Sequence, residues 1–76
     1  MTNLKEAKIG KAVVVVRIDA VGPLRRRVMD MGITKGCKIV VKKIAPFGDP
    51  IEITVRGYEL SLRKDDAEKI IVEYID

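Results

Sequence analysis

The sequence predicts a mainly β fold, a small barrel of about five strands with one or two short helices. Three observations lead to this prediction. Runs of β-branched residues recur along the chain, separated by stretches that contain glycine or proline. The alternation of apolar residues changes parity within residues 51–62, as it does in a tight hairpin. The 76 residues suit one small domain, 1–76, in which closure of short strands into a barrel removes exposed strand edges.

The first two segments are expected to form helical turns and a strand. Residues 2–10 (TNLKEAKIG) favour one or two helical turns, with Thr2 or Asn3 as the N-cap and Gly10 at the end. Residues 11–20 (KAVVVVRIDA) are rich in β-branched side chains and predict a strand. Both faces of this strand are apolar, so it is either covered on both sides or curls within a barrel.

Residues 22–33 (GPLRRRVMDMGI) change to the period of a helix. Pro23 suits the first helical position, where its missing N–H is not needed. Apolar residues follow the i, i+4, i+7 spacing of one helix face: Leu24, Val28 and Met31. Gly32 suits a left-handed cap, with the next residue folding back onto the helix. We therefore expect a short helix here.

Residues 34–46 (TKGCKIVVKKIAP) predict a turn followed by a strand. The turn falls at Lys35-Gly36. Alternation then places three residues on one apolar face: Cys37, Ile39 and Val41. Because Cys37 belongs to this face, a buried small apolar residue is favoured over a metal-binding or redox-active thiol.

The parity change between residues 51–55 and 58–62 predicts a β-hairpin. Apolar residues occupy odd positions before the change and even positions after it. A two-residue loop at Arg56-Gly57 gives every apolar residue an apolar partner: Val55 with Tyr58, Ile53 with Leu60, and Ile51 with Leu62. Gly57 supplies the positive φ that this loop requires, although arginine is a less usual partner for it than asparagine or aspartate.

The C-terminal segment predicts a short helical turn and a last strand. Residues 63–69 (RKDDAEK) form the turn, and residues 69–75 (KIIVEYI) form the strand. Tyr58 and Tyr74 have core-facing parity and are interpreted as packing residues. Three acidic residues lie close together in the turn: Asp65, Asp66 and Glu68. Oxygen ligands of this kind hold divalent ions, but a role at the helix start, where acids complement the helix dipole, is favoured.

Composition removes most of the usual catalytic parts. The chain has no histidine, one cysteine and one serine, Ser61. It therefore lacks the commonest general base, the commonest metal ligand, an internal disulfide and a cysteine-based zinc site. The longest apolar run, 12–16, is far shorter than the ~20 residues of a membrane span, and no secretion signal is evident. We expect a soluble, cytosolic protein that is not an enzyme, and its net charge of +4 favours acidic partners.

The candidate contact residues are Arg25, Arg26, Arg27 and Phe47. At least two of the arginines point outward from a helix with the apolar stripe described above, where a simply solvated helix face is favoured over docking to an acidic surface or lipid headgroups. Phe47 lies between proline and glycine in a loop, as a contact on the rim or as a plug at one end of the barrel. Met29 lies off the apolar stripe, and core filling is favoured over an exposed contact.

An ordered set of short motifs makes the chain recognisable. They are Arg27, Met31-Gly32, Gly36, APFGDP at 45–50, RGYELSLR at 56–63, Ala67 and IIVE at 70–73. With these motifs the sequence resembles the FeoA family of small cytosolic accessory proteins of bacterial and archaeal ferrous iron uptake. The resemblance covers almost the whole chain. It implies an SH3-like β-barrel and a partner, the FeoB-type membrane permease with its cytosolic GTP-hydrolysing domain.

The resemblance implies a non-enzymatic regulatory protein that binds the cytosolic side of this permease. It would require no cofactor, with weak binding of Fe²⁺ or another divalent transition metal left open and no metal ligands assigned. It would be cytoplasmic, at most peripheral to the membrane through its partner. One alternative is a small basic barrel that binds nucleic acid, which three aromatic residues support poorly because they give no stacking platform. Another is a metal-responsive regulator that self-assembles, since exposed strand edges could pair into a homo-oligomer.

Overall fold

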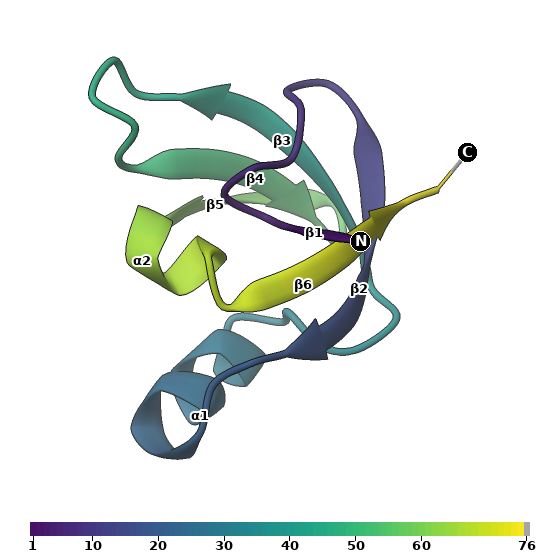
Figure 1. The fold of residues 1–76 in the computed structure, drawn as a ribbon, viewed down its shortest axis with the longest axis vertical. Coiled ribbons are helices and arrows are strands. Elements are labelled where there is room, and N and C mark those ends of the chain that lie inside the picture. The colour runs from purple at the N-terminus through teal and green to yellow at the C-terminus, as the bar shows by residue number, and fades with distance from the viewer. Residues whose placement is uncertain (76) are drawn as a thin grey trace.

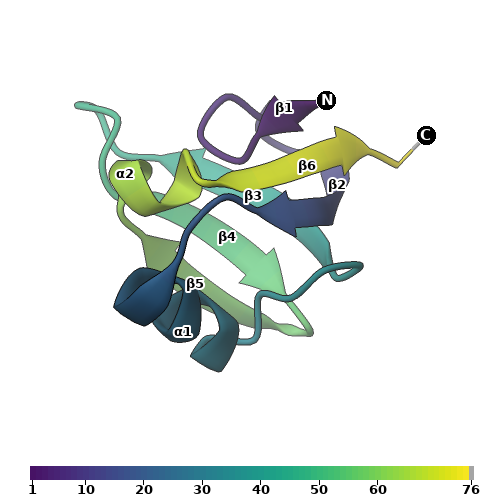
Figure 2. The ribbon, with the colours of Figure 1, turned by 60° about the horizontal axis from the view of Figure 1, so that its bottom comes forward.

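The structure, a computed structural model, describes residues 1–75, which form six strands and two helices. These are β1 (Thr2–Asn3), β2 (Ala12–Ile18), α1 (Gly22–Asp30), β3 (Lys38–Ile44), β4 (Ile51–Val55), β5 (Tyr58–Leu62), α2 (Lys64–Ala67) and β6 (Ile70–Tyr74). All neighbouring strands are antiparallel, in the order β1-β6-β2-β3-β4-β5. Figures 1 and 2 show the sheet curled around one interior. The predicted mainly β barrel with short helices is confirmed.

The core lies inside the curl of the sheet. Every strand from β2 to β6 contributes to it, and so does α1. Its large, fully buried side chains are Leu4, Val13, Val15, Val28, Ile33, Ile39, Val41, Ile51, Ile53, Val55, Leu62 and Ile70. Cys37 is also buried, as its place in the strand alternation predicted. Neither helix of the described residues combines the length and apolar character needed to cross a membrane.

Two β-bulges bend the sheet, and one of them explains why both faces of the segment 11–20 are apolar. The pairing of β2 with β6 shifts between Val15 and Arg17, and that of β3 with β4 shifts between Val41 and Lys43. Buried positions in β2 are therefore Val13, Val15 and then Ile18. An extra residue bends a strand and increases its twist. Of the two readings of the apolar segment 11–20, a strand that curls within the barrel is the one observed.

The β4–β5 hairpin has the predicted register. Val55 pairs with Tyr58, Ile53 with Leu60 and Ile51 with Leu62. Arg56 and Gly57 have φ values of 52° and 84°, so both central residues are left-handed, as in a type I′ turn. The guanidinium of Arg56 donates to the Gly32 carbonyl at 2.9 Å and to the Thr34 hydroxyl at 2.9 Å. These bonds give a physical reason for arginine in a left-handed position that usually favours asparagine.

The predicted N-terminal helical turns are wrong. Thr2–Asn3 form strand β1, which pairs with β6 through Thr2–Val72 and Asn3–Ile71. The Leu4 N–H continues this pairing by donating to the Ile70 carbonyl at 2.9 Å. Local propensity was overridden because the free edge of β6 offers hydrogen bonds that a short isolated helix cannot match. Asn3 keeps a capping role, since its side-chain oxygen accepts the Glu6 N–H at 2.9 Å in the following turn.

The end of α1 follows the prediction closely. Gly32 has a φ of 93°, and the Ile33 N–H donates back to the Val28 carbonyl at 3.3 Å. Ile33 is fully buried, which anchors the end of the helix to the core. Within α1 only Val28 is fully buried. Leu24, and Met31 directly after the helix, are half-buried against the core. The helix therefore attaches by a narrower stripe than its sequence suggests.

Three residues expected in the core are exposed. Tyr58 and Tyr74 keep 43% and 39% of their surface, and Met29 keeps 41%. Both tyrosines lie where the barrel interior ends, with their hydroxyls in hydrogen bonds on the rim. The Tyr58 hydroxyl donates to the Met31 carbonyl, and the Tyr74 hydroxyl accepts the Lys8 N–H at 3.1 Å. The alternation of apolar residues correctly gave the face of the sheet on which the two tyrosine side chains lie. It did not show how deeply those side chains are buried.

Candidate docking surface

Helix α1 projects from the barrel (Figures 1 and 2), and all of its residues except Leu24 and Val28 are exposed. The side chains of Arg25, Arg26 and Met29 are exposed along it, and Val21, just before it, is almost fully exposed. A methionine beside arginines is adaptable apolar surface next to fixed positive charge. This combination suits a protein partner better than it suits a small polar ligand.

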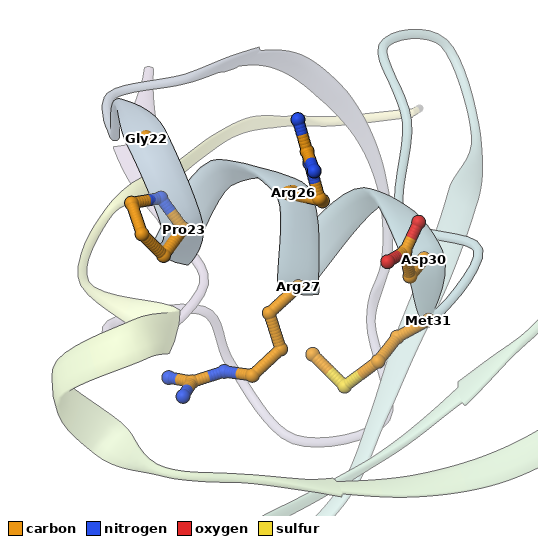
Figure 3. Close-up of a pocket in the computed structure, with 6 residues that line it drawn as sticks. All are labelled: Gly22, Pro23, Arg26, Arg27, Asp30 and Met31. Carbon is orange, nitrogen blue, oxygen red and sulfur yellow. The ribbon is translucent and has the colours of Figure 1, made fainter.

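Two shallow hollows follow the helix. One, of about 570 Å³, is lined by Gly22, Pro23, Arg26, Arg27, Asp30 and Met31. The other, of about 440 Å³, is lined by Gly22, Arg25, Arg26, Met29 and Asp30. Figure 3 shows the side chains of Arg27 and Met31 on the same side of α1, with Arg26 extending the opposite way. The two hollows share Gly22, Arg26 and Asp30, so Arg26 lies where they adjoin.

The three consecutive arginines have different environments. Arg27 forms an ion pair with Asp66 at 2.9 Å, in which the aspartate side chain is only 13% exposed. The guanidinium of Arg25 donates to the Ile18 carbonyl at 3.2 Å. Within residues 1–75, Arg26 takes part in no ion pair or side-chain hydrogen bond. Arg26 is therefore the arginine whose charge is most available to a partner.

The Arg27–Asp66 pair joins the two helices. It links α1 to α2 across 39 residues of sequence. The carboxylate is largely shielded from water while the guanidinium is more than half exposed. Loss of Arg27 would leave a shielded charge without its partner, whereas loss of Asp66 would leave a cation that water can solvate. Arg27 is thus part of the structure as well as a candidate for contact.

The acidic residues near α2 do not form a metal site. Asp66 is engaged by Arg27, and Glu68 is 3.4 Å from the ammonium of Lys5. In the part of the chain that the structure describes, no three His, Cys, Asp or Glu side chains gather where an ion could be held. Asp65 and Asp66 lie in the first turn of α2, where negative charge complements the helix dipole. The side chains present therefore do not fit a preformed divalent-metal site.

Phe47 lies apart from the arginines. It is 93% exposed in the loop between β3 and β4, so the alternative of a plug in the barrel is wrong. Both ribbon views place this loop away from α1, with α2 between them (Figures 1 and 2). The loop is tied to α2, because the Asp49 carboxylate accepts the Lys64 N–H at 3.1 Å. The predicted contact residues thus form two separate surfaces.

Sequence reasoning missed one exposed residue of the α1 surface, Val21, and wrongly favoured core filling for another, Met29. A signal for Met29 was present, because position 29 lies off the helical stripe of Leu24, Val28 and Met31. No comparable signal marks Val21, since an apolar residue before a helix often packs against it.

Comparison with known proteins identifies relatives over nearly the whole chain. A protein of Porphyromonas gingivalis (strain ATCC BAA-308 / W83), the Fe(2+) transport protein A/Fe(2+) transporter FeoB fusion protein, is 40% identical over 73 residues. The match covers 96% of this chain but only 9% of that protein, so this chain corresponds to a small part of it.

Solved structures show the same fold. A FeoA-like protein from Clostridium acetobutylicum superimposes with a TM-score of 0.90 at 44% identity, covering 97% of this chain and 86% of that one. Stenotrophomonas maltophilia FeoA, described as an SH3 domain protein and solved with zinc, gives 0.82 at 22% identity, covering 96% and 91%. The SH3-like barrel expected from the sequence is confirmed. The model of the FeoA domain matches residues 2–74, and the chain therefore belongs to the FeoA family.

Proposed function

We propose that this chain is a non-enzymatic accessory protein of ferrous iron uptake that binds the cytosolic side of a FeoB-type permease. The observation that carries the proposal is the Porphyromonas gingivalis relative, in which a 40% identical segment shares one polypeptide with a FeoB transporter. Domains that occur in one chain are held at high effective concentration, which suits partners that act together. The protein would be cytoplasmic and would reach the membrane through its partner.

The surface of α1 supports docking to an acidic protein face. Arg26 offers a charge that forms no ion pair with any described residue, and Met29 adds exposed apolar area on the same helix. The net charge of +4 would speed encounter with an acidic partner. A regulatory effect requires more than contact, because a ligand shifts an equilibrium only when it binds one state better than another. The proposal therefore includes an affinity that depends on the nucleotide bound to the permease.

Titration of the isotope-labelled chain with the permease's cytosolic domain, with and without nucleotide, tests docking by NMR. We expect nucleotide-dependent shifts in residues 24–31. The double variant Arg25→Ala/Arg26→Ala should weaken binding by about tenfold, which corresponds to ~1.4 kcal/mol. Lys11→Ala/Lys42→Ala is the matched control, since it removes the same charge from exposed sites elsewhere. Equal loss in both variants would mean that net charge, and not the α1 surface, governs binding.

The same titration decides between the two surfaces. The docking site would be the β3–β4 loop, and not α1, if two results are obtained together. The NMR shifts would be confined to residues 45–50, and binding would be lost in Phe47→Ser but retained in Arg25→Ala/Arg26→Ala. An absence of shifts with the cytosolic domain and with the full permease in detergent, both folded, would overturn the proposed function.

We propose further that the chain alone binds Fe²⁺ only weakly. Two of the acidic residues near α2, Asp66 and Glu68, are engaged in ion pairs, and the chain has no histidine. Anaerobic calorimetric titration should therefore give no saturable heat with micromolar Fe²⁺. A stoichiometric, saturable signal in that range would contradict this expectation and would favour a metal-responsive regulator.

A further inference from the structure

Strand β5 is an open edge of the sheet. It comes last in the strand order, and among the strands of residues 1–75 its only neighbour is β4. The pairing is regular over all five residues, with no bulge. Its sequence, YELSL, contains neither the lysine nor the proline with which proteins commonly block a sheet edge. The opposite edge differs, since β1 is only two residues long.

The hairpin geometry shows which main-chain groups of β5 are free. In a hairpin with a two-residue loop, the residues that flank the loop exchange hydrogen bonds, and every second residue along the strand repeats this. Tyr58, Leu60 and Leu62 therefore bond to β4 through their backbones. The N–H and C=O groups of Glu59 and Ser61 point away from β4, and within residues 1–75 neither residue has another backbone partner. Both residues are exposed.

The side chains around this edge indicate what would pair with it. On the barrel side, Tyr58 is partly exposed and Leu60 only half-buried, which leaves apolar surface beside the free backbone groups. Exposed cations lie at both ends, Arg56 in the hairpin loop and Arg63 after the strand. The anions on this face are Glu59 in the strand and Glu52, which lies opposite Ser61 on β4 and is paired with Lys43. Charge complementarity therefore favours an extended segment with acidic residues and an apolar side chain between them.

We propose that the β5 edge accepts an extended, acidic segment of the permease as an added strand. Main-chain hydrogen bonds to Glu59 and Ser61 would supply affinity, and contacts with Leu60 and the flanking arginines would supply selectivity. This inference rests on the proposed function and adds to it the mode of binding. It also places part of the contact on a rigid strand and not on α1 alone.

The test uses Ser61→Pro with Ser61→Thr as its matched control. Proline removes the outward N–H of residue 61 and places its ring on the edge, whereas threonine keeps the N–H. The barrel should remain folded, because no described residue uses that N–H, and an amide NMR spectrum checks this. We expect Ser61→Pro to weaken binding of the permease's cytosolic domain by about tenfold or more and Ser61→Thr to leave it within about twofold.

Hydrogen exchange of the unsubstituted chain gives an independent readout. The amides of Glu59 and Ser61 should exchange rapidly in the free chain and at least about tenfold more slowly with the cytosolic domain bound. This measurement decides the matter if Ser61→Pro does not fold. If the complex with the cytosolic domain forms but the exchange rates of the Glu59 and Ser61 amides do not change, the inference is overturned and the proposed function remains intact.

Two further outcomes are distinct. If the unsubstituted chain does not bind the permease at all, the proposed function fails and the inference fails with it. If the two amides are protected without the permease, and protection rises with the concentration of the chain, a second copy occupies the edge. That result would overturn the assignment of the edge to the permease.

Discussion

Replacing Ile53 with alanine is expected to lower the free energy of unfolding by about 2–5 kcal/mol. Ile53 is fully buried in the middle of β4, between Val41 on β3 and Leu60 on β5. Domains have net stabilities of about 5–15 kcal/mol, and small ones bury too little surface to reach the upper part of that range. A single cavity at this position should therefore consume a large part of the stability of the barrel.

Urea denaturation followed by circular dichroism measures the effect. Ile53→Val should cost only about 0.5–1.5 kcal/mol, because it removes one methyl group. Thr54→Ala, at the next residue on the outer face, should cost less than about 1 kcal/mol. A loss for Ile53→Ala as small as that for Thr54→Ala would show that β4 does not face the core as described.

Gly32→Ala is expected to destabilise the protein by about 2–3 kcal/mol, from two separate causes. The φ of 93° costs a residue with a Cβ about 1–2 kcal/mol. A Cβ at this position would also lie 2.5 Å from the Tyr58 hydroxyl oxygen, which must move and lose its bond to the Met31 carbonyl. The second cause makes Gly32 more sensitive than an ordinary turn glycine.

Gly36→Ala provides the matched comparison. Its φ is 89°, but nothing lies within 4 Å of the added Cβ, so it incurs the backbone cost alone. Thermal and urea unfolding of both variants should show a larger loss for Gly32→Ala. Adding Tyr58→Phe should recover part of the difference only in the Gly32→Ala background. Equal losses at the two glycines would show that the tyrosine contact does not matter to stability.

Sequence reasoning succeeded where local patterns determine the structure. The register of the β4–β5 hairpin followed from parity, because opposed residues in a tight hairpin share a face. The end of α1 followed from Gly32, because few other residues adopt its backbone conformation at low cost. Strand β1 could not be predicted in this way. Its partner is β6, at the other end of the chain, and two residues carry no periodic pattern of their own.

Only part of the candidate site could be predicted from the sequence, again because local patterns do not show which distant segments meet. The helical period predicted that at least two of Arg25, Arg26 and Arg27 point outward, and all three are exposed. The ion pair of Arg27 with Asp66 did not, because it depends on how α1 and α2 meet across the barrel. Strand parity likewise gave no indication that Tyr58 lies on the rim, since alternation assigns a side chain to a face and not to a distance from the edge.

The position of β6 between β1 and β2 has a consequence for synthesis in the cell. Residues 70–74 are made after all the other strands, yet they supply the strand that both β1 and β2 pair with. The β2–β3–β4–β5 meander can assemble earlier, because its strands are neighbours in sequence. Until residues 70–74 have emerged from the ribosome, the edge of β2 that pairs with β6 stays free, and apolar side chains of the barrel interior stay uncovered. A nascent chain stalled before residue 70 should therefore be a substrate for chaperones and prone to aggregation.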